Sequence, residues 1–202
     1  MAEAVVTKRF ALRPLIVPGR HGKPTGDAGV TLRVVDEMAA AHVSARKGQN
    51  VALLQVLSRM FGAPVADLPQ RVAKDTLSVT GISPGQWRLV ARGGDGDAAL
   101  RMAVAELQHV AVTTDIGDGL VLADISGPRA RQALAKGIAV DLHPRAFAVG
   151  AAAQTRAAHI ALHLALIDDT PTFEVLSAAS TAGSLWAWLT ASCGEYGYDI
   201  KA

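Results

Sequence analysis

The chain has 202 residues, 50% of them hydrophobic, and a formal net charge of +2. With no low-complexity tract, this length and composition predict a globular protein that buries a substantial core as one body or two small halves. Residues 157–167, the longest apolar stretch, are far fewer than the ~20 that span a membrane, and basic residues interrupt any N-terminal secretion signal. We therefore expect a cytoplasmic protein with no membrane partner.

Residues 1–28 are predicted to form an extended, basic N-terminal arm. Prolines and glycines recur there too closely for helix or strand periodicity, and within residues 1–25 five basic residues stand against the single acidic Glu3. Apolar residues such as Phe10, Leu12 and Leu15 are too many for a purely disordered tail, so the arm is expected to dock on the body of this chain or on a neighbour. Basic charge with Phe10 as the only aromatic residue is a poor nucleic-acid signature, so no nucleic-acid partner is expected.

Residues 29–118 are predicted to form a first α+β half. Residues 30–35 alternate as a strand, and residues 50–61 follow helical spacing up to a stop at Gly62. Two strands at 76–81 and 86–92 flank a Ser-Pro-Gly turn. A helix capped by Asp97 and a strand starting at residue 110 complete the half. The order strand, helix, strand, strand, helix, strand is that of the split βαβ, or ferredoxin-like, unit.

Residues 119–202 are predicted to repeat this order as a second half. The expected elements are a strand at 120–125, a helix at 128–136 capped by Ser126, strands at 160–167 and 172–176, and a helix at 182–193. The fold class is therefore predicted as α+β, with duplicated split βαβ halves that pack side by side.

The last helix carries Trp186 and Trp188 about 100° apart. Either one of them packs inward while the other lies at a contact between halves or subunits, or the helix is buried on two sides. Cys193, the lone cysteine, excludes an internal disulfide and is expected to be a buried small hydrophobe.

No catalytic, cofactor-binding or metal-ligating residue is predicted in this chain. Asp141 and His143 form the best acid and base pair, but before a proline such residues more often bond the backbone. His159 and His163 share a face of a predicted strand about 13 Å apart, which is too far for one metal. The glycine-rich residues 93–96 lack the lysine and hydroxyl of a phosphate-binding loop and predict a flexible link.

Three separated segments, in this order, carry a resemblance to a known family. They are Gly-Ile-Ser-Pro-Gly-Gln-Trp-Arg-Leu-Val-Ala at residues 81–91, Ser-Gly-Pro-Arg-Ala-Arg-Gln-Ala-Leu-Ala-Lys-Gly at 126–137 followed by Asp-Leu-His-Pro-Arg-Ala-Phe at 141–147, and Pro-Thr-Phe-Glu-Val-Leu at 171–176 running into Ser-Leu-Trp-Ala-Trp-Leu at 184–189. Together they resemble the gamma subunit family of heterotetrameric sarcosine oxidases, over roughly residues 27–197.

This resemblance implies a non-catalytic subunit with a fold like that of the folate-binding aminomethyltransferases. Its partners would be an alpha subunit above all, a beta subunit and a small delta subunit. FAD, FMN, NAD, zinc and tetrahydrofolate would belong to those partners and not to this chain. The complex would oxidise sarcosine to glycine, with hydrogen peroxide and 5,10-methylenetetrahydrofolate as further products.

Other functions stay open at this point. The chain could be a stand-alone folate-binding aminomethyltransferase-like protein, but the glutamate that holds the pterin in those enzymes has no equivalent in Asp168-Asp169-Thr170-Pro171. Glu174 is the nearest carboxylate and is expected to face solvent. The chain could also be the gamma subunit of a related N-methyl amino acid oxidase or dehydrogenase. An RNA-binding ferredoxin-like module is disfavoured, since aromatic residues make up only 4% of the chain.

Overall fold

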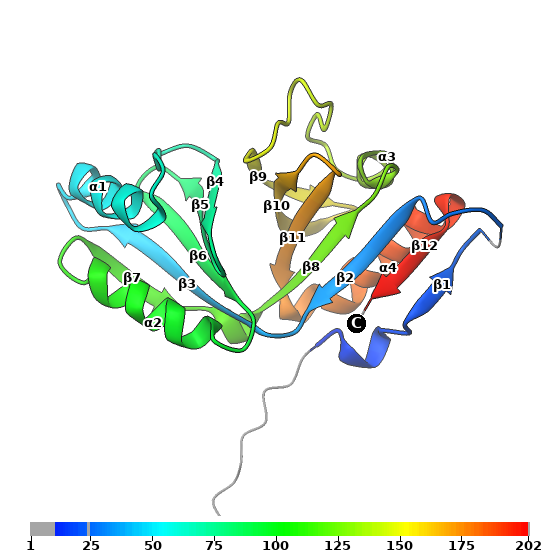
Figure 1. Ribbon diagram of the computed structural model, residues 1–202, viewed down its shortest axis with the longest axis horizontal. Helices are drawn as coiled ribbons and strands as arrows, with labels where there is room; N and C mark the ends of the chain where they lie inside the picture. Colours follow the sequence, from blue (N-terminus) through cyan, green and yellow to red (C-terminus); the bar gives the residue numbers. More distant parts are fainter. Residues whose placement is uncertain (1–10, 24, 202) are drawn as a thin grey trace, which may run out of the picture.

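The computed structural model describes residues 11–23 and 25–201. The protein has an α+β fold with two sheets and their covering helices (Figure 1). Its elements are η1 (Arg13–Leu15), β1 (Gly19–His21), β2 (Val30–Val35), β3 (Met38–Ala45), α1 (Asn50–Phe61), β4 (Arg71–Lys74), β5 (Leu77–Ser83), β6 (Gln86–Arg92), α2 (Gly96–Leu107), β7 (Ala111–Asp115), η2 (Gly117–Gly119), β8 (Leu120–Ser126), α3 (Ala130–Ala135), β9 (Ala152–Ala157), β10 (Ile160–Asp168), β11 (Thr172–Ala178), η3 (Ala179–Thr181), α4 (Ala182–Cys193), η4 (Gly194–Tyr196) and β12 (Tyr198–Lys201).

The first sheet has five antiparallel strands in the order β4-β5-β6-β3-β7. Without the added edge strand β4, the sequence β3-α1-β5-β6-α2-β7 is a split βαβ unit, as predicted. Helices α1 and α2 cover one face of this sheet. Side chains alternate between the two faces along each strand, and the apolar stripes of the helices pack on those that point to the helix-covered face. The centre of this core is made by Leu53, Leu57, Trp87, Leu89 and Leu107.

The second sheet has seven strands in the order β1-β12-β2-β8-β11-β10-β9. The sequence β8-α3-β10-β11-α4-β12 repeats the split βαβ order, so the predicted duplication is present. Strand β2 is inserted between β12 and β8, parallel to β12 and antiparallel to β8. Helices α3 and α4 cover one face and bury a core that includes Leu134, Leu164, Phe173, Leu185 and Leu189.

The two sheets lean toward each other as the arms of a V, with the helices on its outer sides (Figure 1). The connection from β2 to β3 crosses at the base of the V. A third and smaller apolar cluster joins the inner faces of the sheets, made of Met38, Ala40, Val90, Leu122 and Leu176. Residues of β3 and β6 thus pack on residues of β8 and β11, which fixes the two units against each other.

The strand at Val30–Val35 is present but does not open the first unit as predicted. Its neighbours β12 and β8 belong to the seven-stranded sheet, so the strand that begins the five-stranded unit is β3 instead. Strand β3 was not predicted, because its run of alanines has weak strand propensity and its burial on both faces removes the alternation that marks a half-buried strand.

Two predicted helix caps are wrong. Asp97 lies inside the first turn of α2, and the preceding Asp95 makes no side-chain capping bond. Ser126 is the last residue of β8, and α3 begins four residues later after Arg129, again without a side-chain cap. The glycine stop of α1 is confirmed, since Gly62 adopts a left-handed conformation with φ of 65°.

The arm packs on the body of its own chain where the structure describes it. Leu12 is fully buried in the core of the seven-stranded unit, and Trp186 donates from Nε1 to the carbonyl of Leu15 at 3.1 Å. Strand β1 pairs with β12, and His21 stacks on Tyr198. The predictions for Phe10 and the residues before it lie outside the described residues.

Both tryptophans of α4 contact this chain, as the two-sided alternative predicted. Trp186 packs under the arm, whereas the half-buried Trp188 lies against Gly137 after α3. Cys193 is fully buried, as predicted, and burial raises the pKa of its thiol to about 12. Within the described residues, no helix is both long and apolar enough to cross a membrane.

Candidate functional site

The inner faces of the two sheets carry an unusual concentration of charge. Successive side chains of a strand point to opposite faces, so Trp87 and Leu89 enter the core under the helices while Arg88 and Arg92 face the other sheet. Arg71 of β4 lies on the same inner face. The five-stranded sheet therefore presents three arginines to the space between the sheets.

The seven-stranded sheet presents two carboxylates and an imidazole to this space. Asp124 of β8 and Glu174 of β11 are directly opposite each other in the antiparallel register. His163 of β10 lies opposite Leu176 of β11. All three polar side chains are buried, at 8%, 4% and 6% exposure, because the facing sheet covers them.

Arg92 and Arg71 bind the two carboxylates across the V. Arg92 donates to both oxygens of Asp124 at 2.8 and 2.9 Å and to Glu174 at 2.5 Å. Arg71 lies 3.3 Å from the same Glu174 oxygen. Such planar, forked contacts are the strong form of ion pairing, and here they connect β4 and β6 of one sheet with β8 and β11 of the other.

The pKa values in this cluster follow from the pairing. Burial on its own raises the pKa of Glu174, but the positive charges of Arg71 and Arg92 outweigh burial and hold that pKa below its usual value. Burial lowers the pKa of Arg92, and the hydrogen bonds and charges of Asp124 and Glu174 more than reverse this. Glu174 and Arg92 are therefore charged at neutral pH, and all four side chains are paired with one another.

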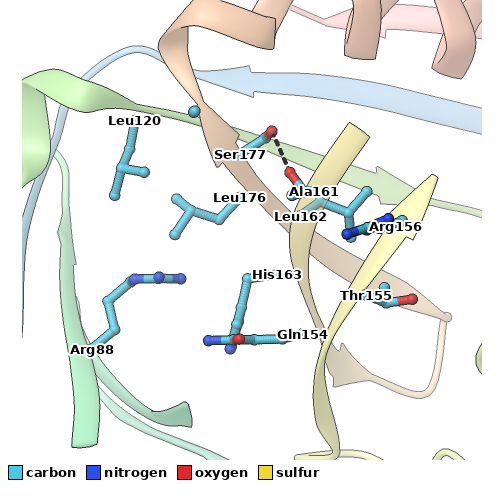
Figure 2. A pocket seen from close by; sticks show the side chains of 11 residues that line it. Arg88, Leu120, Gln154, Thr155, Arg156, Ala161, Leu162, His163, Leu176 and Ser177 are labelled. Atoms are coloured by element: carbon cyan, nitrogen blue, oxygen red, sulfur yellow. Dashed lines mark hydrogen bonds between the residues drawn. The ribbon is translucent and has the colours of Figure 1, made fainter. Parts of the chain in front are cut away.

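A pocket of about 460 Å³ lies beside this ion cluster (Figure 2). It is lined by Arg88, Leu120, Gln154, Thr155, Arg156, Ala161, Leu162, His163, Leu176, Ser177 and Ala178. Figure 2 shows the side chain of Arg88 reaching from the five-stranded sheet toward His163 on the other sheet. The pocket thus lies between a cation on one sheet and a buried imidazole on the other.

His163 is neutral in this setting. Burial, and after it the charge of Arg88, lowers the pKa of its imidazole from 6.5 to about 4. Its Nε2 atom is buried without a hydrogen-bond partner among the described residues, and the same holds for Nε of Arg88. The hydroxyl of Ser177 donates to the carbonyl of Ala161 at 2.8 Å. Ser177 is therefore held by the backbone and is not aligned with His163 as a nucleophile with its base.

Of the candidates weighed from the sequence, His163 lines this pocket, whereas Asp141, His143, His159 and residues 93–96 do not. Asp141 accepts from the backbone N–H of His143 at 2.9 Å in an exposed loop, which confirms the structural interpretation of that pair. His159 lies in the exposed turn between β9 and β10. The prediction that it shares a strand face with His163 is therefore wrong. The glycine-rich residues 93–96 link β6 to α2. Within the described residues, no three His, Cys, Asp or Glu side chains are grouped to hold a metal ion.

The prediction that Glu174 faces solvent is wrong. Strand β11 is covered on both sides, by α4 on one face and by the five-stranded sheet on the other. Arg92 and Asp124 were not among the candidates predicted from the sequence. The sequence did contain one signal for this cluster. An arginine ends one apolar strand and acidic residues lie within two others, and charges that become buried in this way must pair with one another.

Comparisons with known proteins agree with this architecture. Residues 43–195 match the family described as the sarcosine oxidase gamma subunit family. A chain of the heterotetrameric sarcosine oxidase from Corynebacterium sp. U-96 is 24% identical with a TM-score of 0.72, over 85% of this chain and 87% of that one. No protein in a search of curated sequences matches.

The aminomethyltransferase T of the glycine cleavage system from Bartonella henselae has the same fold. It is 16% identical with a TM-score of 0.63, over 86% of this chain and 48% of that one. This chain therefore spans about half the length of that enzyme, and the predicted likeness to the aminomethyltransferase fold is confirmed.

Proposed function

The chain belongs to the sarcosine oxidase gamma subunit family, and we propose that it is a non-catalytic, structural subunit of a heterotetrameric flavoenzyme. The complex would oxidatively demethylate sarcosine to glycine and form hydrogen peroxide and 5,10-methylenetetrahydrofolate. The observation that carries this proposal is the family match, which extends over both duplicated units. The role of the chain would be to bury surface against larger partners, chiefly the alpha subunit.

The chemistry of the inter-sheet space supports a structural role. Asp124, Glu174, Arg71 and Arg92 neutralise one another across the V, so none of them is available as a general acid or base. His163 has an imidazole that stays neutral, and no nucleophile is aligned with it among the described residues. The FAD, FMN, NAD, zinc and folate of the complex would accordingly be held by the partner subunits.

A folate-dependent enzyme is the alternative function that the shared fold raises. The carboxylate nearest to the position of the pterin-holding glutamate is Glu174, and both Arg71 and Arg92 bind it. A pterin at this carboxylate would have to displace two partly buried arginines from a buried glutamate, which would cost several kcal/mol. The pairing of Glu174 with both arginines favours the structural role over folate binding by this chain.

Co-expression tests the proposal. The chain alone should be colourless, should show no heat of binding with tetrahydrofolate by calorimetry, and should not turn over sarcosine. With alpha, beta and delta subunits it should co-elute in a yellow complex on size exclusion and form hydrogen peroxide from sarcosine. Omitting only this chain provides the control, and the remaining subunits should then fail to form the full complex. Micromolar binding of tetrahydrofolate by the isolated chain, or its separate elution from the partners, would refute the proposal.

A further inference from the structure

The buried and partly buried groups between the sheets carry one more positive charge than negative, and Arg156, which also lines the pocket, is exposed. Arg71, Arg88 and Arg92 contribute three cations, while Asp124 and Glu174 contribute two anions and His163 contributes none. Arg71 and Arg92 are paired, so the surplus lies on Arg88. Its guanidinium makes no hydrogen bond or close ion pair with any other described residue, and its Nε is buried. A partly buried cation without a counter-ion is costly in a folded protein.

A second unpartnered group points into the same pocket. His163 is 6% exposed, and its Nε2 lacks a hydrogen-bond partner among the described residues. In a neutral imidazole one ring nitrogen carries a proton, so Nε2 can donate a hydrogen bond without carrying charge. Arg88 and His163 therefore approach the pocket from opposite sheets as two free donors (Figure 2).

We propose that this pocket binds a small organic monocarboxylate, whose carboxylate lies between the Arg88 guanidinium and His163 Nε2. The nearby Leu120 and Leu176 form an apolar wall for the rest of the ligand. The pocket volume of about 460 Å³ is within the range of small-molecule sites, roughly 300–1,000 Å³. The proposal does not rest on the function of the whole complex, because every residue involved belongs to this chain.

The charge balance selects a monoanion over phosphate or sulfate. The one surplus charge among the groups that are not exposed is neutralised by one carboxylate, and the negative charge of Glu174 already acts on Arg88. A doubly charged anion would place excess negative charge beside that carboxylate, and like charges in a poorly solvated space repel strongly. Arginine also matches the planar geometry of a carboxylate through two parallel hydrogen bonds.

Benzoate titrated into the full-length chain labelled with ¹⁵N-histidine tests the proposal by NMR. Benzoate up to about 20 mM should shift the imidazole nitrogens of His163, with a Kd in the millimolar range that is usual for so small a ligand. His21, His109, His143 and His159 serve as internal controls, whereas His42 does not, because it lies opposite Arg88 on the neighbouring strand. Uncharged benzamide should shift His163 at least about tenfold less at equal concentration, since it cannot neutralise Arg88.

Matched variants locate the carboxylate. Arg88→Gln should weaken benzoate binding by at least about tenfold, whereas Arg101→Gln, on the exposed side of α2, should leave the Kd unchanged. If Arg88→Gln does not fold, Arg88→Lys replaces it and should bind benzoate with reduced affinity. Equal binding of benzamide, tighter binding of phosphate, or no shift of His163 would each overturn the proposal.

The same titration on the assembled complex distinguishes a free carboxylate ligand from a carboxylate side chain of a partner subunit. A free metabolite should still reach His163 in the complex, so the benzoate shift should persist there. Loss of the shift on assembly would show that a carboxylate side chain of a partner subunit fills the pocket. That result would overturn a small-molecule site while leaving the structural role of the chain intact.

Discussion

Asp124 and Glu174 lie directly opposite each other on β8 and β11, and Arg92 from the other sheet binds both of them. Like charges at directly opposed positions normally destabilise a sheet. Here the two carboxylates form a single acceptor site for a guanidinium that approaches from across the V. The apolar cluster around Leu122 and Leu176 fixes the distance between the sheets, and the arginines fix their relative position.

Replacing Arg92 should therefore destabilise the fold strongly. Arg92→Met leaves Asp124 without its partner and Glu174 with Arg71 alone, and removing one member of a buried pair costs about 3 kcal/mol or more. Urea unfolding followed by circular dichroism measures this loss. Arg101→Met, at an exposed site of α2, is the matched control and should change stability by less than ~0.5 kcal/mol.

A double variant separates charge from packing. Arg92→Met combined with Asp124→Asn removes the unpaired carboxylate, so it should recover part of the stability lost in Arg92→Met. An equal loss in the single and double variants would mean that the packing of the arginine, and not its charge, holds the sheets together.

The local elements of this fold could be predicted from the sequence, whereas the insertion of β2 into the seven-stranded sheet could not. Helical spacing and Gly62 define α1, and the Ser83-Pro84-Gly85 turn defines the hairpin of β5 and β6, because these signals act within a few residues. The choice of sheet by β2 depends on pairing with β8 and β12, which lie about 90 and 170 residues away. Nothing in residues 30–35 encodes that choice.

The candidate site was hidden for the same reason. Arg88 lies on β6, far along the chain from the hairpin of β10 and β11 that carries His163 and Glu174, and each residue alone has the sequence context of an ordinary strand residue. Only the packing of the two sheets shows that these side chains face one another. The family resemblance implied the fold and an assembly role but assigned no function to any residue in this space.

Stability should fall as the pH is lowered from 6.5 toward 5. The imidazole of His163 has a pKa of about 4 when folded, lowered by burial and by Arg88, against 6.5 when unfolded. Below pH 6.5 the unfolded chain therefore binds a proton that the folded chain does not, which favours unfolding. The expected loss at pH 5 is roughly 2 kcal/mol relative to pH 7, from 1.36 kcal/mol per pH unit. Urea unfolding at several pH values in carboxylate-free buffer measures it.

His163→Gln tests the assignment of this pH dependence. The variant should lose most of the slope between pH 6.5 and 5, while His42→Gln should retain most of it, because His42 is less buried and its pKa is lowered less strongly. Glu174 does not contribute in this window, since its lowered pKa affects stability only below its ordinary value of 4.5. An unchanged slope in His163→Gln would assign the pH dependence to other groups.

Gly81→Ala should disrupt the edge of the five-stranded sheet. A Cβ at this position would lie 2.0 Å from the carbonyl oxygen of Leu68, which is a backbone atom and cannot rotate away. The N–H of Gly81 also donates to the carbonyl of Gln70 at 3.0 Å, so the two segments cannot separate without loss. We expect a destabilisation of about 1–3 kcal/mol by urea unfolding. Gly119→Ala, where a Cβ meets nothing within 4 Å, should stay within ~0.5 kcal/mol of the parent chain and provides the control.

The described part of the arm should contribute to folding and not only to assembly. Leu12 is fully buried in the core of the seven-stranded unit, whereas Leu15, three residues later, is 42% exposed. Leu12→Ala leaves a cavity and should cost about 2–5 kcal/mol, while Leu15→Ala should cost less than ~1 kcal/mol. Thermal unfolding of the isolated chain should therefore show a clearly lower Tm for Leu12→Ala alone. The opposite result would be that both variants keep the parent Tm but fail to co-elute with the partner subunits. The burial of Leu12 would then not be needed for this chain to fold, and the arm would act at the subunit interface.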